Sequence, residues 1–275
     1  MLANWVVPAA ARAAPGAVDI GWPEMLASVS LVAVALVLSL WRRLDLERPL
    51  LEASIRAAVQ LIAVGFLFTF IFDAGGAQAL AWLWVVGMIG VAVFVVHRRA
   101  PTIPGLWKAV LVSVGGSTAV SLALVFGLGV FEQDPVTVVV IAGITVGNVL
   151  PASVLAAQQL ERHFVEEQGQ VEALLSLGLD GHGATRFIGP RAARTALVGQ
   201  IERTKVVGLV ALPGAMTGLL LAGVDPMDAV LVQLIVMYLI LGATAVAVTT
   251  IVWAGSKAAF TKDLRLAAWT RHNPD

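Results

Sequence analysis

The sequence predicts an all-α, polytopic integral membrane protein with seven transmembrane helices. Hydrophobic residues make up 59% of the 275 residues, charged residues only 13%, and the mean hydropathy is +0.88. Apolar runs of roughly 20 residues, the length that crosses a bilayer, recur along the chain. Because lipid offers no hydrogen-bond partner to an open backbone, each run is expected to be helical.

The seven apolar runs divide the chain into three parts. We expect an external tail at 1–24, a transmembrane domain at 25–257 with a cytoplasmic loop at 158–205, and a cytoplasmic tail at 258–275. The predicted spans are 25–41, 57–72, 79–96, 109–131, 136–157, 206–224 and 229–255.

The basic residues predict the orientation. Seventeen of the eighteen Lys and Arg residues lie in the loops after the first, third and fifth runs or in the C-terminal tail. By the positive-inside rule these loops are cytoplasmic, with the N-terminus outside and the C-terminus inside. The two termini lie on opposite sides of the membrane only if the number of spans is odd. The charge pattern therefore supports seven spans independently of hydropathy. We expect a multi-pass protein of the cell inner membrane.

Composition and motifs exclude several activities. The chain has no cysteine, which rules out disulfides, thiolate metal ligands and a cysteine nucleophile. A net charge of zero gives no indication of nucleic-acid binding. A phosphate-binding GxxxxGK[ST] loop is missing, and no carboxylate lies in the middle of the second to seventh runs. We therefore expect no catalytic residue, metal site or cofactor, and an energy source on another chain.

The loop at 158–205 predicts a helix, a turn and a second helix. Apolar residues recur at helical spacing among glutamates, and Gly178 stands where a helix C-cap is expected. Thr185 is the predicted cap of the second helix, which Pro190 kinks or resets. A short surface helix ended by glycine suits insertion into a groove on a partner. An ordinary solvated surface helix is the alternative.

Within this loop, Glu172, Ala173, Gly178 and Ile188 are spaced as in a known motif. Their spacing resembles that of the loop through which permeases of ABC transporters contact their ATPase. Leu174 replaces the second alanine of that motif, and Pro190 comes one residue early. The resemblance implies a separate ATPase subunit, and one such loop per chain implies a homodimer of the permease.

Polar or kinked positions inside the predicted spans are candidates for a substrate path. Prolines free a backbone carbonyl one turn earlier, and amide side chains in lipid need partners. The alternative for each is helix-to-helix hydrogen bonding or packing, and a buried methionine is more often packing than a ligand. The candidates are Gln60, Asn148, Pro151, Met216 and Gln233.

A wider set of residues carries a second resemblance. These residues are Arg56 and Ala57, Gln60 and Leu61, Gly65, Ala142 and Gly143, Gly147 and Asn148, residues 175–178, Ala184 and Thr185, residues 204–210, residues 212–214, and Met216, and the match extends through Gly218, Ala222 and Gly223, Asp225 and Pro226, and Ala229. The set resembles the FetB-type permeases, described as bacterial iron exporters and related to plant aluminium-tolerance permeases. This resemblance implies a FetA-like ATPase partner and export of iron or another metal ion or small solute. The membrane runs offer no carboxylates for hard iron, so iron is implied by the resemblance alone.

Two other classes of membrane protein are alternatives to a transporter. A seven-helix retinal protein needs a lysine in its last span, and 229–255 contains none. A non-transporting membrane anchor or assembly protein with a docking loop stays open. A permease is expected to regulate hydrolysis by its ATPase, whereas an anchor need not.

Overall fold

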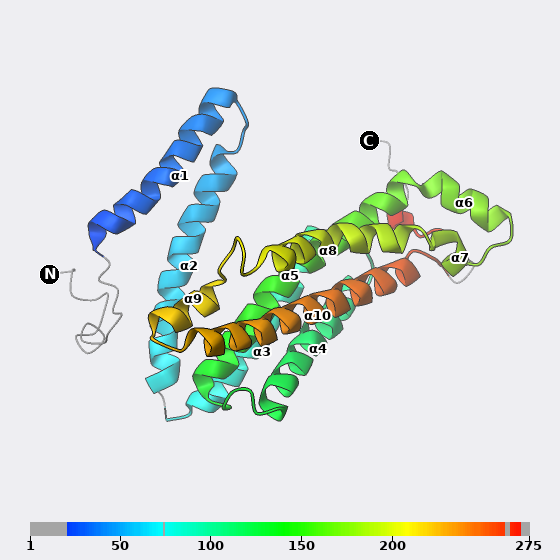
Figure 1. The fold of residues 1–275 in the computed structure, drawn as a ribbon. Helices are drawn as coiled ribbons and strands as arrows, with labels where there is room; N and C mark the ends of the chain where they lie inside the picture. The colour runs from blue at the N-terminus through cyan, green and yellow to red at the C-terminus, as the bar shows by residue number, and fades with distance from the viewer. Residues whose placement is uncertain (1–20, 74, 262–264, 271–275) are drawn as a thin grey trace. The chain divides into compact units, whose positions relative to one another are not determined.

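The computed structural model describes residues 21–73, 75–261 and 265–270. Within these residues the regular structure is ten α-helices and one 3₁₀-helix, with no β-strand, which confirms the all-α prediction (Figure 1). The elements are α1 (Trp22–Arg42), α2 (Glu47–Asp73), α3 (Ala77–Arg99), α4 (Leu106–Gly127), α5 (Pro135–Glu166), α6 (Gln168–Ser176), α7 (Gly181–Thr185), α8 (Ile188–Val206), α9 (Gly214–Leu221), α10 (Pro226–Ala258) and η2 (Ala268–Thr270).

Five helices of the described chain are long and apolar enough to cross a membrane. They are α2, α3, α4, α5 and α10, and α1 adds a shorter apolar stretch, Leu26–Arg42. These six helices contain or overlap six of the seven predicted runs. The chain is thus a multi-pass membrane protein, while the count of seven spans and the orientation stay predictions.

The predicted sixth span, 206–224, is not a continuous helix. Helix α8 ends at Val206, residues 207–213 are non-helical, and α9 has only eight residues. Gly208 adopts a left-handed φ of 88°, and Pro213 has no amide hydrogen to continue a helix. A helix of eight residues spans about 12 Å, well short of a bilayer. Hydropathy found the apolar run and missed the backbone break within it.

The chain divides into two compact units, Met1–Gly75 with Thr217–Ala229, and Gly76–Met216 with Val230–Asp275. In the first unit, α1 and α2 form a helical hairpin. Its turn is held by Ser39, whose hydroxyl donates to Glu47 Oε1 at 2.7 Å and accepts from the Leu46 amide at 3.2 Å. Most of the predicted external tail 1–24 lies outside the described residues.

Helix α5 is the central element of the second unit. It packs against α3, α4, α8 and η2, and its 32 residues continue through Pro151 without ending. Helix α10 lies against the same core through two close approaches, Gly255 to Leu160 of α5 and Val252 to Gly189 of α8. Helix α5 also runs nine residues beyond the predicted span end at 157, because the end of an apolar run does not require a helix to end.

Residues 265–270, within the predicted C-terminal tail, pack on the core. Trp269 donates its indole N–H to the carbonyl of Ala258 at 3.0 Å, and its ring lies edge-on to Phe164 with centroids 5.4 Å apart. Thr270 and Leu266 are buried. The described part of this tail therefore helps to hold the end of α5, and residues 262–264 and 271–275 lie outside the description.

We predict that Phe164→Ala lowers the free energy of unfolding by about 3–5 kcal/mol, because it leaves a cavity beneath Trp269. The midpoint of thermal unfolding in detergent measures this effect. Phe66→Ala is the matched control, since that ring is 66% exposed on an apolar helix. Equal shifts for the two variants would contradict the packing described here.

Candidate functional site

The predicted docking residues of α6 lie at the surface. Glu172 and Ala173 are exposed, and Leu174 is half-buried. The Glu172 carboxylate accepts a hydrogen bond from Gln168 Nε2 at 2.8 Å, one turn earlier. Beyond the helix, Leu177 is 78% exposed, an unusual position for a leucine in a loop predicted to face water. Helix α6 therefore presents a small apolar and acidic surface.

Gly178 ends α6, as predicted, in a Schellman motif. Its φ is 87°, its amide donates to the Leu175 carbonyl at 3.0 Å, and the Leu179 amide donates to the Leu174 carbonyl at 3.2 Å. Glycine is required because a Cβ is strained in this left-handed conformation. The turn therefore fixes the direction in which the chain leaves α6.

Asp180, and not the predicted Thr185, is the N-cap of α7. The Asp180 carboxylate accepts from the Gly183 amide at 2.7 Å, whereas the Thr185 hydroxyl donates to the Gly181 carbonyl inside the helix. The next helix, α8, carries Pro190 in its first turn, where a missing amide hydrogen breaks no helical bond. Pro190 therefore lies in the first turn of α8, where it does not kink the helix.

Ile188 has a different position from the other predicted docking residues. It is fully buried, at the first position of α8, within the core formed with α5 and α10. A fully buried side chain cannot contact a partner protein directly. Ile188 instead fixes the start of α8 to the core.

Three charged or titratable side chains, Glu167, Arg191 and His163, meet where α5, α6 and α8 join, and we call this cluster the elbow. Glu167 separates α5 from α6, and its Oε1 lies 2.6 Å from Arg191 Nη1 of α8 and 3.8 Å from His163 Nδ1. The Glu167 side chain is 18% exposed and that of Arg191 is 58% exposed, so solvent screens this ion pair mainly from the arginine side. The Arg191 guanidinium also lies over the Phe187 ring at 5.6 Å. These contacts tie the beginning of α8 to the junction of α5 and α6.

A cavity of about 300 Å³, lined by four polar side chains among mostly apolar residues, lies at the opposite end of α8, between α5, α8, the break and α10. Arg203 of α8 donates from Nη1 to Asn148 Oδ1 of α5 at 3.1 Å, while Asn148 Nδ2 donates to the Ile144 carbonyl at 2.8 Å. Arg203 is the one charged side chain among the described residues that line it. The other lining residues are Ile144, Gln200, Val207, Ala211, Pro213, Gly214, Ala215, Gln233, Val236, Met237 and Ile240.

Two buried amide side chains in this cavity have polar atoms without a partner. Gln200 and Gln233 are 8% and 4% exposed, and neither Gln200 Nε2 nor Gln233 Oε1 has a hydrogen-bond partner in the described protein. A buried polar atom without a partner costs about 1–3 kcal/mol. Such groups call for a partner, which can be a bound water, an ion or a ligand, so this cavity is a binding site candidate.

Part of the non-helical segment 207–213 borders the cavity. Val207, Ala211 and Pro213 line it, whereas Leu209 and Val210 are 92% and 83% exposed. The Gly208 amide donates to the Ala211 carbonyl at 3.0 Å, and the Ala211 amide to the Val206 carbonyl at 3.3 Å. Open backbone at membrane depth is tolerated where it is buried in protein or lines a cavity. The break in the predicted sixth span therefore contributes to the cavity through these three residues.

The structure brings together two of the five predicted path residues. Asn148 and Gln233 both line the cavity. Pro151 is exposed on α5 one turn beyond Asn148, Met216 is half-buried in α9, and Gln60 is exposed on α2. None of these three lines the cavity.

Sequence reasoning missed Gln200 and Arg203, which complete the cavity. Both fell in the predicted cytoplasmic loop 158–205, because the hydropathy boundary was placed after them. Their spacing of three residues puts them on one face of a helix, and this could have indicated a shared environment with the polar residues of the spans.

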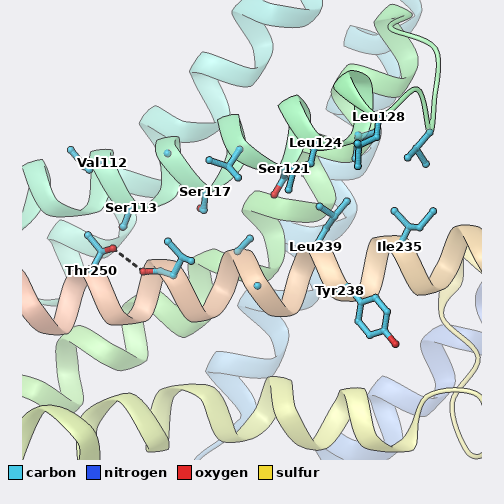
Figure 2. A pocket seen from close by; sticks show the side chains of 17 residues that line it. Val112, Ser113, Ser117, Ser121, Leu124, Leu128, Ile235, Tyr238, Leu239 and Thr250 are labelled. Carbon is cyan, nitrogen blue, oxygen red and sulfur yellow. Dashed lines mark hydrogen bonds between the residues drawn. The ribbon is translucent and has the colours of Figure 1, made fainter.

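A second cavity, about 690 Å³, lies between α4 and α10 and has a different character (Figure 2). Ser113, Ser117 and Ser121 of α4 line it. The hydroxyls of Ser113 and Ser117 donate to carbonyls of their own helix at 3.1 Å, and that of Thr250 does the same at 2.8 Å. No charged residue lines it among those described. It suits an apolar occupant rather than a polar solute.

Comparison with known proteins identifies similar chains throughout the membrane region. The model of a family described as "Uncharacterised protein family (UPF0014)" matches residues 22–260. The match includes α1 to α10 and both parts of the candidate site. No solved structure matches the chain.

Three curated relatives illustrate the similarity. "UPF0014 membrane protein STAR2" of Oryza sativa subsp. japonica is 36% identical over 82% of this chain and 79% of its own length. "Probable iron export permease protein FetB" of Escherichia coli K12 is 32% identical over 79% of this chain and 84% of its own length. "Protein ALUMINUM SENSITIVE 3" of Arabidopsis thaliana is 32% identical over 90% of each chain.

We predict that Gly178→Ala destabilises the end of α6 by about 1–2 kcal/mol, because alanine is strained at the φ of 87°. Gly169→Ala is the matched control, since Gly169 lies within α6 and a Cβ there meets open space. Helix propensity alone favours this control change by up to about 1 kcal/mol. Hydrogen exchange of residues 168–178 measures both effects. Faster exchange in the control than in Gly178→Ala would contradict the role of the Schellman turn.

Proposed function

Because the chain belongs to the UPF0014 family, we propose that this membrane permease is the membrane-spanning subunit of an ATP-driven ABC transporter that exports iron or another metal ion. The relative from Escherichia coli that is named an iron export permease supports the cargo and its direction. The proposal places the chain in the cell inner membrane, with α6 and α7 in the cytoplasm. Hydrolysis of ATP belongs to a separate subunit, and two copies of the permease pair with two ATPases.

The observation that carries this proposal is the position of α8. Its 19 residues extend over roughly 28 Å, with Ile188 and Arg191 at the end beside α6, and Gln200 and Arg203 at the cavity. A helix of this length transmits displacement because its backbone bonds are internally satisfied. Force applied at the docking surface can therefore reach the polar cavity through one rigid element.

Coupling proceeds in three structural steps. The ATPase engages the exposed side of α6, including Glu172 and Leu177. The elbow ion pair of Glu167 with Arg191 carries the displacement of α6 to α8. Movement of α8 against α5 then changes the position of Arg203 relative to Asn148, which alters the cavity. Both arrangements of α8 need similar free energies for ATP to select between them.

We predict that Glu172→Arg, or the bulky change Gly178→Trp, lowers ATP-dependent transport by about tenfold, which corresponds to about 1.4 kcal/mol of lost interaction free energy. Insertion into the membrane is expected to remain intact, because both positions are exposed. Glu132→Arg is the matched control, an exposed glutamate in the loop before α5 on the predicted opposite side of the membrane. Transport by the reconstituted complex measures the effect. Full export by both docking variants would contradict the docking role.

Purification of the full-length chain from its native membranes tests the partnership directly. We expect an ATPase subunit to co-purify, and its turnover to respond to the permease. A passive anchor would bind without changing hydrolysis. Transport by the chain alone, in vesicles that contain no ATPase, would refute the proposal.

A further inference from the structure

We infer that the cavity between α5, α8 and α10 binds an oxyanion group, a carboxylate or phosphate, of the exported solute. This inference rests on the proposed transport function and concerns the form in which the cargo is recognised. A metal would be carried as an anionic chelate and not as a bare cation.

The charge of the cavity favours an anion. Arg203 has five N–H donors, and the hydrogen bond to Asn148 uses one of them, at 3.1 Å. No carboxylate is present among the described lining residues to balance this charge. The described chain also has no group of three His, Asp or Glu side chains arranged for a metal ion. A bare cation would therefore meet a positive charge and no anionic ligand.

The two buried glutamines provide polar groups for the same ligand. Gln200 Nε2 is a donor that suits an oxyanion, and Gln233 Oε1 is an acceptor that suits a hydroxyl or a protonated oxygen. Both residues line the cavity and are more than nine-tenths buried. Both atoms are covered in the ligand-free protein, so a solute that bears an oxyanion and a hydroxyl would satisfy them after the two amides rotate towards the cavity. An apolar solute would satisfy neither.

The beginning of α9 adds a third contribution. Gly214 and Ala215, its first two residues, line the cavity after the break. The first amides of a helix have no partner within the helix, and its N-terminus carries the positive end of the helix dipole. Broken membrane helices direct such ends towards anionic groups of solutes. Gly214 has no side chain, so a ligand can approach this backbone closely.

The cavity volume limits the part of the solute that is bound. About 300 Å³ is at the lower end of small-molecule sites. This volume accommodates a carboxylate or phosphate with a few neighbouring atoms. We therefore assign the cavity to one polar group of a small solute.

Ligand-induced thermal shifts of the full-length chain in nanodiscs test this inference without an ATPase. The probes are sodium phosphate, sodium citrate, ferric citrate and, under anaerobic conditions, ferrous chloride, with sodium chloride as the ionic-strength control. We expect phosphate, citrate or ferric citrate to raise the unfolding temperature, and ferrous chloride to have no effect. The comparison of citrate with ferric citrate distinguishes a free anion from a metal chelate.

Variants identify the site of binding. Arg203→Ala is expected to weaken anion binding about tenfold, because a charged hydrogen bond is lost. Gln200→Leu and Gln233→Leu are also expected to weaken anion binding. Each removes a buried polar atom without a partner, so the ligand-free variants are expected to be at least as stable as the unmodified protein. A purely structural role for the glutamines would instead lower the stability of the ligand-free protein. Arg194→Ala of α8 and Gln158→Leu of α5, both exposed and outside the cavity, are the matched controls.

Three results would overturn the inference. They are binding of ferrous ion with sensitivity to Arg203→Ala, absence of binding by every probe, and anion binding that all the cavity variants retain. None of these results bears on the proposed ATPase partnership, because co-purification and stimulated hydrolysis test that partnership separately. Conversely, anion binding without any ATPase partner would sustain the cavity and refute the transport mechanism.

Discussion

The requirement that every backbone polar group within a bilayer be satisfied governs this structure. Five membrane-length helices meet it with internal hydrogen bonds. The segment 207–213 does not, although its composition is as apolar as a helical span. It meets the requirement partly through turns at Gly208 and Ala211 and partly by lining a polar cavity. The break ends α8, and in the proposed function it borders the place where a polar solute is held.

This break gives α8 two functional ends. At Ile188 the helix is fixed in the core, and at Arg191 it is tied to the elbow through Glu167. At the other end Arg203 reaches Asn148 of the central helix α5. In the proposed mechanism, α8 therefore connects the docking surface of α6 with the cavity.

Sequence reasoning predicted the helical class, the approximate positions of six apolar helices and the glycine turn at Gly178, because each follows from local residue pattern. It did not predict the helix break within the sixth apolar run, since hydropathy measures solvent preference and not backbone continuity. Of the candidate path, it found Asn148 and Gln233, whose polarity within apolar runs is visible. It missed Gln200 and Arg203 because their shared cavity depends on how α8 packs against α5 and α10. The burial of Ile188 likewise depends on tertiary packing that no spacing motif reports.

The central claim, that the break lines a water-accessible polar cavity, can be tested by cysteine labelling because the natural chain contains no cysteine. Ala211→Cys places a thiol at the cavity wall, and Val86→Cys places one on an exposed apolar face of α3. The measurement is the rate of modification of the chain in membranes by a charged, membrane-impermeant thiol reagent. We expect Ala211→Cys to react and Val86→Cys to be protected by lipid. Equal protection of both thiols would contradict the account.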